Sequence, residues 1–215
     1  MRAWERPRGR GPGALGHLRV SGGALGVTGP MGAWRDWYHV DGHTYGTWLP
    51  GDPRGWRAKK HRRHVDGDYR DPPPAGTGEA LLQRSRRLLK HPPVRLDASQ
   101  RECAGRALVE MLIRQEVELL VLSIDAMHYH LLGRFRDGQV RRGVGRAKKH
   151  AWHRLRERRQ IGKVWQKLCH VTAIADRAHQ VNAFRYIRSH GRKGAWVWMF
   201  RQGVYWHDPP KRIEE

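Results

Sequence analysis

Cysteines and long apolar runs are both scarce in this sequence. Only two cysteines occur among the 215 residues, Cys103 and Cys169, and they lie far apart. Two cysteines cannot build a disulfide scaffold or a four-cysteine zinc site, and such low usage agrees with a reducing compartment. No run approaches the roughly 18 apolar residues that a membrane span needs, and the N-terminus lacks the apolar segment of a secretory signal. We therefore expect a cytoplasmic, nucleoid-associated protein without membrane contact.

Acidic residues are also scarce relative to basic ones. The chain has 20 Asp and Glu against 42 Lys and Arg, which gives a formal net charge of +22. Residues 1–33 contain five Arg and one Glu, a net +4, so +18 remains in the rest of the chain. A protein with this much positive charge is expected to bind a polyanion, most commonly nucleic acid. The 10 tryptophans either stack on unpaired bases or fill the core.

The two ends of the chain differ in composition from its body. Residues 1–33 are rich in Gly, Arg and Pro and have neither helical nor strand periodicity, so we expect disorder there. This tail is a basic arm on nucleic acid, a tail without function, or sequence upstream of a start at Met31. Residues 207–215 form a second, polar tail. Between them, residues 34–206 are expected to form a single domain.

This body alternates between strand-like and helix-like segments. Aromatic, β-branched or apolar runs predict strands at 37–48, 117–124, 128–135, 164–175 and 195–200. Apolar periodicity and capping signals, including a capping box from Ser99 to Glu102 and a cap at Asp176, predict helices at 78–90, 99–116, 143–159 and 176–190. This order predicts an α+β fold of the ferredoxin-like sandwich type, with an antiparallel sheet and helices on one face. The other face would then be free for a ligand.

Residues 49–96 form a Pro-rich, basic insertion that is too long for an ordinary connection, so it is either functional or mobile. Its basic cluster is a candidate grip on phosphates, through Arg57, Lys59, Lys60, Arg62 and Arg63. The helix expected at 143–159 adds Arg146, Lys148 and Lys149, which are phosphate contacts or a solvated face. Trp48, Trp56 and Trp152 are candidates for base stacking, with core packing as the alternative.

The segment His128-Tyr129-His130 is the sharpest local feature. Residues i and i+2 of a strand point to the same face, so both imidazoles would project from one side and could hold a metal ion together. A surface pair of histidines is the alternative. Tyr129 and Leu131 should then point to the opposite side and pack under the helices. Asp125 could accept a hydrogen bond from one of the histidines or simply form the bend between the strands.

A second constellation lies on the helix expected at 176–190. Tyr186 and His190 are four residues apart and therefore share a helical face. A tyrosine beside a metal-bound phosphate can act as a nucleophile and form a covalent phosphotyrosine link. The alternative is that Tyr186 packs in the core or in an interface.

The sequence resembles the single-tyrosine HUH transposases, a family that includes insertion-sequence transposases and their REP-associated relatives. Four segments carry the resemblance: YGTWLPGDPRG (Tyr45 to Gly55), SIDAMHYHLL (Ser123 to Leu132), AKKHA (Ala147 to Ala151) and AHQVNAFRYIRSH (Ala178 to His190). They are spread over most of residues 37–200. The HYH segment fits the family's His-hydrophobic-His pattern, and Tyr186 matches the family's tyrosine on a late helix.

The resemblance implies a specific chemistry. The family cuts single-stranded DNA, usually next to a hairpin, through a 5′-phosphotyrosine intermediate and a free 3′-hydroxyl, with Mg²⁺ or Mn²⁺, and its members typically act as homodimers. The resemblance implies that His128 and His130 are metal ligands and that Tyr186 is the nucleophile. The third ligand would be His190, at a position where Gln or Asn is more usual. The expected function is DNA transposition or mobilisation of a REP-type element.

Three other functions remain open on the sequence. The first is a domesticated DNA-binding protein without catalysis. The second is a replication initiator or relaxase-like nickase, which shares the metal and tyrosine chemistry but usually has additional domains. The third is an RNA-binding module with a ferredoxin-like sheet, which would carry aromatic side chains on the sheet surface in place of a histidine pair.

Overall fold

The computed structural model describes residues 34–54, 56–57, 64–65, 74–136, 138–157, 162–201 and 203–205, all of which belong to one structural unit, Ala33–Glu215. The predictions for the tails 1–33 and 207–215 fall outside these residues. The same holds for Lys59, Lys60, Arg62 and Arg63, and for Arg57 only the backbone is described.

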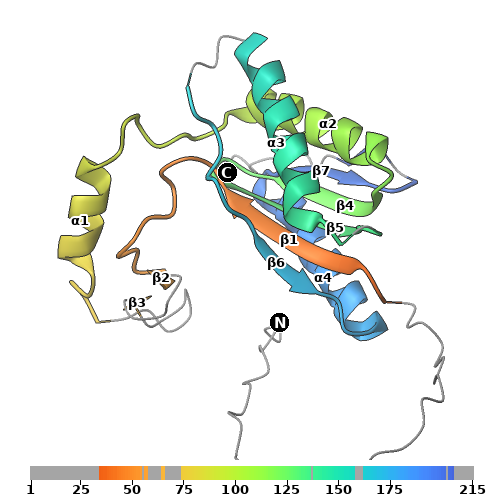
Figure 1. Cartoon of the computed structure of the whole chain (residues 1–215), viewed down its shortest axis with the longest axis horizontal. Coiled ribbons are helices and arrows are strands. Elements are labelled where there is room, and N and C mark those ends of the chain that lie inside the picture. The colour runs from red at the N-terminus through yellow and green to blue at the C-terminus, as the bar shows by residue number, and fades with distance from the viewer. Residues whose placement is uncertain are drawn as a thin grey trace, which may run out of the picture. The chain divides into compact units, whose positions relative to one another are not determined.

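The main sheet has six strands in the order β6-β1-β5-β4-β7-β8, and each neighbouring pair is antiparallel (Figure 1). The strands are β1 Trp37–His43, β4 Glu118–Ile124, β5 His128–Arg134, β6 His170–Ala173, β7 Trp196–Met199 and β8 Gly203–Tyr205. Within the insertion, β2 Trp56–Arg57 and β3 His64–Val65 form a separate two-stranded pair. The strand predicted at 164–175 is shorter in the structure, where β6 spans only His170–Ala173. An isolated bridge between Thr44 and Trp165 precedes it.

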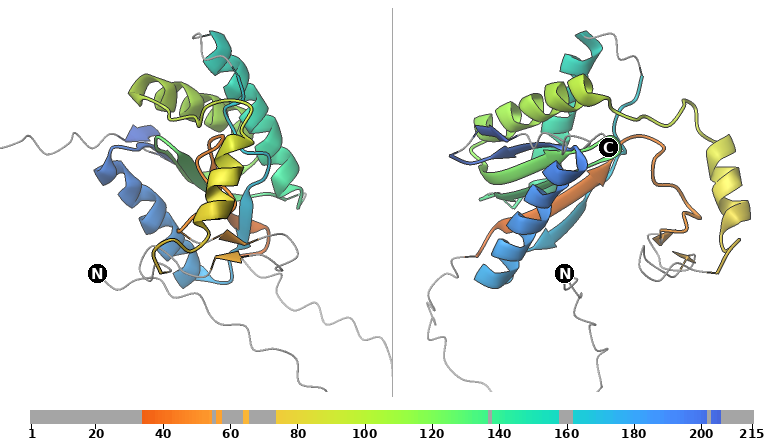
Figure 2. Two further views of the ribbon diagram at one scale, coloured as in Figure 1. Left: turned by 90° about the vertical axis from the view of Figure 1, so that its left-hand side faces the viewer. Right: turned by 180° about the vertical axis from the view of Figure 1, so that it is seen from behind.

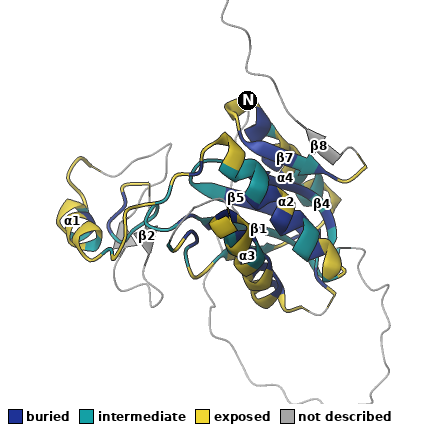
Figure 3. Ribbon diagram, turned by 90° about the horizontal axis from the view of Figure 1, so that it is seen from above, coloured by how far each residue is buried: buried dark blue, intermediate teal, exposed yellow. Residues whose placement is uncertain are grey.

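The described helices are α1 Glu79–Arg87, α2 Ala98–Arg114, α3 Val140–Glu157 and α4 Arg177–Ser189, which continues into a 3₁₀ turn, His190–Lys193. Helices α2 and α3 pack on each other and on one face of the sheet, whereas α4 crosses the other face (Figures 1 and 2). The buried residues divide in the same way into a larger cluster under α2 and α3 and a smaller one under α4. Most of α1 is exposed (Figure 3).

The predicted α+β class with an antiparallel sheet is confirmed, and the position of α4 adds to it. Strand β4 is apolar on both faces: Leu122 belongs to the cluster under α2 and α3, and Val121 to the cluster under α4. A strand that is apolar on both sides needs cover on both sides. Ala183 and Ile187 of α4 supply this cover, so, contrary to the prediction, the helices do not all lie on one face of the sheet.

Two predicted helix starts had different outcomes. Asp176 is the N-cap of α4, and its side chain accepts a hydrogen bond from the His179 backbone N–H at 2.8 Å, as predicted. Helix α2 instead begins after Asp97, which forms a capping box with Gln100. The predicted box from Ser99 was therefore wrong, because Asp97 and Gln100 offer the same reciprocal bonds two residues earlier.

Candidate metal centre

The side chains of β5 alternate between the two faces of the sheet, which places His128 and His130 on the same face. Tyr129 and Leu131, between and after them, are completely buried in the cluster under α2 and α3. Because successive side chains of a strand point to opposite faces, the two histidines project to the α4 side. Their ring centroids are 4.9 Å apart, and the predicted orientation of all four side chains is confirmed.

Strand β1 brings further potential ligands to this face. In the antiparallel register Asp41 lies opposite His130 and His43 lies opposite His128, with His39 two residues before Asp41. These three residues were not predicted as ligands, although the alternation of polar residues in His39-Val40-Asp41-Gly42-His43 indicates one face of a strand. This pattern points to the histidine cluster only once β1 is known to pair with β5.

Helix α4 supplies the third side of the cluster through His190, the first residue of the 3₁₀ turn at its end. The His190 ring centroid lies 4.8 Å from that of His130 and 5.3 Å from that of His128. One ligand nitrogen from each of His128, His130 and His190 lies within 4.8 Å of the others, which makes the three a candidate metal site. A second group, His39, Asp41 and His130, meets the same criterion and shares His130.

Asp125 fixes both the bend before β5 and the ring of His128. Its Oδ1 atom accepts hydrogen bonds from the backbone N–H groups of Met127 (2.7 Å) and His128 (2.8 Å). Its Oδ2 atom lies 2.6 Å from Nδ1 of His128. Both predicted roles of Asp125 are therefore present together. A carboxylate that accepts from Nδ1–H leaves Nε2 of the same ring as the electron-pair donor.

His130 has one ring nitrogen engaged and one without a partner. Its Nδ1 atom lies 3.2 Å from Nε2 of His39, so one imidazole donates a hydrogen bond to the other. Its Nε2 atom is buried, and no other described group accepts from it or donates to it. A buried polar atom without a partner is costly. A cation bound by this nitrogen would satisfy it, so the residues present fit a metal ion.

Burial also keeps these imidazoles in the state that binds metals. The pKa of His190 is lowered to about 4, mainly by burial and then by the neighbouring His128. The pKa of His43 is lowered to about 4 for the same two reasons, and burial holds the pKa of His130 well below its ordinary value. Neutral imidazole is the form that donates an electron pair to a metal ion.

Tyr186 stands beside this cluster and is accessible from outside. Its ring centroid lies 5.0 Å from that of His190, 5.3 Å from that of His130 and 6.1 Å from that of His39. About half of the residue (50%) is exposed. The alternative of a core tyrosine is therefore excluded, and the phenol can meet a ligand that enters from solvent.

The predicted phosphate contacts on α3 do not belong to this cluster. Arg146 and Lys149 are exposed, but α3 covers the opposite face of the sheet. Lys148 is buried, and its ammonium group donates to the backbone carbonyls of Gln166 (2.6 Å) and Lys167 (3.4 Å). The phosphate contact predicted for Lys148 was therefore wrong, since this ammonium group links α3 to the segment before β6.

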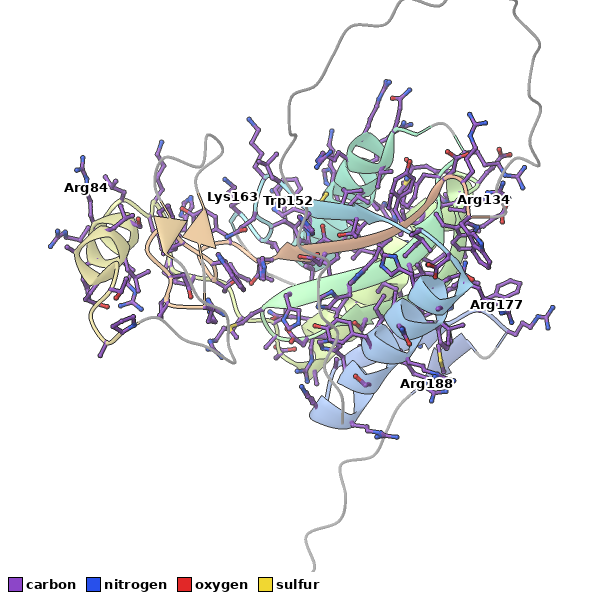
Figure 4. All side chains as sticks on the ribbon, turned by 90° about the horizontal axis from the view of Figure 1, so that it is seen from below. Arg84, Arg134, Trp152, Lys163, Arg177 and Arg188 are labelled. Carbon is purple, nitrogen blue, oxygen red and sulfur yellow. The ribbon has the colours of Figure 1, made fainter. Side chains whose placement is uncertain are left out.

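Two of the three candidate stacking tryptophans, Trp48 and Trp152, have protein partners, and the side chain of Trp56 lies outside the described part of the chain. Trp152 donates a hydrogen bond from Nε1 to the Gly162 carbonyl at 2.7 Å and packs against the core under α2 and α3, and the sheet separates it from α4 (Figure 4). Trp48 lies with its ring centroid 4.6 Å from that of His43, and the Arg54 guanidinium is 4.6 Å from its centroid. Of the two candidate tryptophans whose side chains are described, Trp48 is therefore the one that adjoins the histidine cluster.

No protein-family model and no curated protein matches the chain. None of the described helices has the length and apolar character needed to cross a membrane.

Proposed function

We propose that the protein cleaves and rejoins single-stranded DNA in a metal-dependent reaction that uses Tyr186 as the nucleophile. The observation that carries this proposal is the position of an accessible phenol next to two buried histidines, His130 and His190, of a three-histidine cluster. The Tyr186 ring centroid lies 5.3 Å from that of His130 and 5.0 Å from that of His190. Phosphoryl transfer to a tyrosine requires such a nucleophile close to the ligands of a metal ion. The resemblance to single-tyrosine HUH transposases points to the same reaction.

In the proposed reaction the Tyr186 oxygen attacks the phosphorus of a phosphodiester. A new bond forms between the phenolic oxygen and phosphorus while the bond from phosphorus to the 3′ oxygen breaks. The phenol loses its proton, and the departing 3′ oxygen gains one to become a free hydroxyl. Attack by a 3′-hydroxyl on the phosphotyrosine reverses these changes and reseals a strand, so no external energy source is needed.

His128, His130 and His190 would hold a divalent ion, which when bound polarises the phosphoryl oxygens and orients the scissile group. Asp125 keeps the His128 ring in the tautomer that donates from Nε2. The resemblance implies Mg²⁺ or Mn²⁺. Because three nitrogen donors suit a transition metal better than Mg²⁺, we propose Mn²⁺ as the better of the two.

The remaining elements of this proposal rest on the resemblance and the net charge. We propose hairpin-bearing single-stranded DNA as the substrate, a homodimer as the active assembly and transposition, or mobilisation of a REP-type element, as the biological outcome. Sedimentation of the full chain at micromolar concentration tests the assembly: a dimer supports it, and a monomer both with and without DNA contradicts it.

A trapping experiment tests the chemistry. Labelled single-stranded oligonucleotides that contain imperfect hairpins are incubated with the full chain and Mn²⁺, and covalent adducts are separated on a denaturing gel. We expect an adduct from the wild type and none from Tyr186→Phe. Tyr38→Phe is the matched control, since Tyr38 packs against the core under α2 and α3, and it should keep the adduct. Binding without any adduct would favour a DNA-binding protein that lacks catalysis.

A further inference from the structure

An open cavity of about 670 Å³ reaches Met127, the residue before the candidate metal ligand His128. Its walls come from the turn after β1, which includes Thr47 and Arg54, and from the end of α1 with the segment that follows it, residues 86–95. Met127, directly before the metal-ligand candidate His128, completes the lining. The cavity is therefore lined both by residues of the insertion at 49–96 and by the bend between β4 and β5.

Hydrogen bonds fix the wall formed by residues 86–95 to the residues that follow β1. Thr44 donates from Oγ1 to the Val94 carbonyl (2.7 Å), and Val94 donates from its backbone N–H to the Tyr45 carbonyl (2.8 Å). The Lys90 backbone N–H donates to Oη of Tyr45 (3.1 Å). Leu96, just beyond the cavity, is buried. This part of the insertion is thus a built surface and not a loose connection.

The lining carries an excess of positive charge. Arg86, Lys90 and Arg95 are exposed, and no described carboxylate forms an ion pair with them. Arg54 is the exception, since Asp52 accepts from its Nε (2.8 Å) and Nη2 (2.5 Å) atoms. Cations that line one hollow without a described carboxylate partner favour an anionic ligand. Leu89, Pro92 and Pro93 also line the cavity and offer apolar contact area.

A continuous row of side chains joins this cavity to the metal centre. The His43 ring centroid lies 6.0 Å from that of His128 and 4.6 Å from that of Trp48. The Arg54 guanidinium, which lines the cavity, lies over the Trp48 ring. An extended ligand with one anionic group at the metal centre could therefore follow this row and place further anionic groups in the cavity.

We propose that this cavity binds the backbone phosphates of single-stranded DNA next to the phosphate that Tyr186 attacks. The identity of the ligand as DNA rests on the proposed function, whereas the phosphate chemistry rests on the cavity itself. Arg86 and Lys90 are the principal contacts because they have no described carboxylate partner; Arg86 lies in the last turn of α1, and Lys90 lies three residues after its end. The cavity would set how the strand enters the site.

The test compares two double variants of the full chain that remove the same charge from α1 and the residues just after it. Arg86→Ala with Lys90→Ala alters the cavity. Arg84→Ala with Arg87→Ala is the matched control, because these two exposed residues do not line the cavity and Arg84 projects outward from α1 (Figure 4). Binding of a fluorescent oligo-dT 20-mer is measured over a series of salt concentrations, without requiring cleavage.

We expect the cavity variant to bind about tenfold more weakly than the control variant, with the slope of log K against log salt reduced by about 1.4, since single strands lose roughly 0.7 per phosphate contact. Equal losses in the two variants, or no loss in either, would overturn the proposal. Tight binding of dTTP that only the cavity variant loses would also overturn it in favour of a mononucleotide site. Wild-type binding without any covalent adduct would defeat the proposed function, whereas the phosphate-binding role of the cavity would still stand if only the cavity variant loses binding.

Discussion

The Nδ1 atom of His128 lies 2.6 Å from the Oδ2 atom of Asp125, across the bend between β4 and β5. The other oxygen of the same carboxylate accepts from the backbone N–H groups of Met127 and His128. One side chain therefore sets both the path of the chain and the direction of the imidazole. Hydrogen bonds behind a metal ligand orient it and raise its basicity.

Replacement of Asp125 by asparagine separates these two roles. Asparagine keeps an oxygen for the backbone N–H groups but presents an amide NH₂ group to His128. This NH₂ group cannot accept a hydrogen bond from the imidazole. We expect Asp125→Asn to fold normally and to bind Mn²⁺ about 10- to 100-fold more weakly, the usual effect of losing such a partner. Calorimetric titration with Mn²⁺ measures this. Asp176→Asn removes the same charge at a helix cap and should bind like the wild type; unchanged binding by Asp125→Asn would refute the assigned role.

The identity of the third ligand controls which metal binds best. Three imidazole nitrogens favour Mn²⁺ and later transition metals over Mg²⁺, whereas an amide oxygen is a harder donor that suits Mg²⁺. We expect His190→Gln to narrow the affinity difference between Mn²⁺ and Mg²⁺, and His190→Ala to weaken both. Competition titrations with the two ions test this. If Asp41→Asn disrupts binding while His190→Gln leaves it unchanged, the ion occupies the group of His39, Asp41 and His130 instead.

Acid should destabilise the metal-free protein in a defined range of pH. In the unfolded chain His190 binds a proton near pH 6.5, whereas in the folded chain burial lowers its pKa to about 4. Between these values the unfolded state holds more protons, so the free energy of unfolding falls as the pH falls. Between pH 7 and pH 5 we expect His190 alone to account for about 2 kcal/mol, at 1.36 kcal/mol per pKa unit.

Urea unfolding of the metal-free protein at pH 7 and pH 5 measures this loss. The variant His190→Gln carries no titrating group at this position, so its loss of stability over the same range should be smaller than that of the wild type. An equal loss in both proteins would show that His190 does not titrate as its burial requires.

Two glycines in helices provide a matched test of the packing. A Cβ atom at Gly105 of α2 would collide with the ring of Trp196, whereas a Cβ at Gly145 of α3 would meet nothing within 4 Å. We expect Gly105→Ala to lower the free energy of unfolding by about 1–3 kcal/mol through overpacking. Gly145→Ala should raise it by up to about 1 kcal/mol through helix propensity. Thermal unfolding measures both, and a stabilised Gly105→Ala variant would contradict the packing of α2 on β7.

Local patterns in the sequence predicted those parts of the fold and site that depend on periodicity. The pair His128 and His130 could be placed on one face, with Tyr129 in the core, because the strand repeat of two residues alone decides it. The cap at Asp176 followed from side-chain chemistry that acts over three residues.

Other features depend on which elements become neighbours, and a single segment does not carry that information. The contribution of His39 and Asp41 follows from the pairing of β1 with β5. The apolar run of β4 shows only that both of its faces need cover; that α4 provides the cover on one face follows from the packing of Ala183 and Ile187. The burial of Lys148 follows from the path of residues 166–167. Long-range pairing also brings the end of α1 to the cavity beside Met127.

The position of a bound ion tests the central claim most directly. Crystals of the full chain grown with Mn²⁺ would reveal the ion through its anomalous scattering. We predict a peak coordinated by His128, His130 and His190, with the Tyr186 hydroxyl turned toward it. A peak bound by His39 and Asp41 without His190, or no peak at any of these histidines under saturating Mn²⁺, would contradict the account.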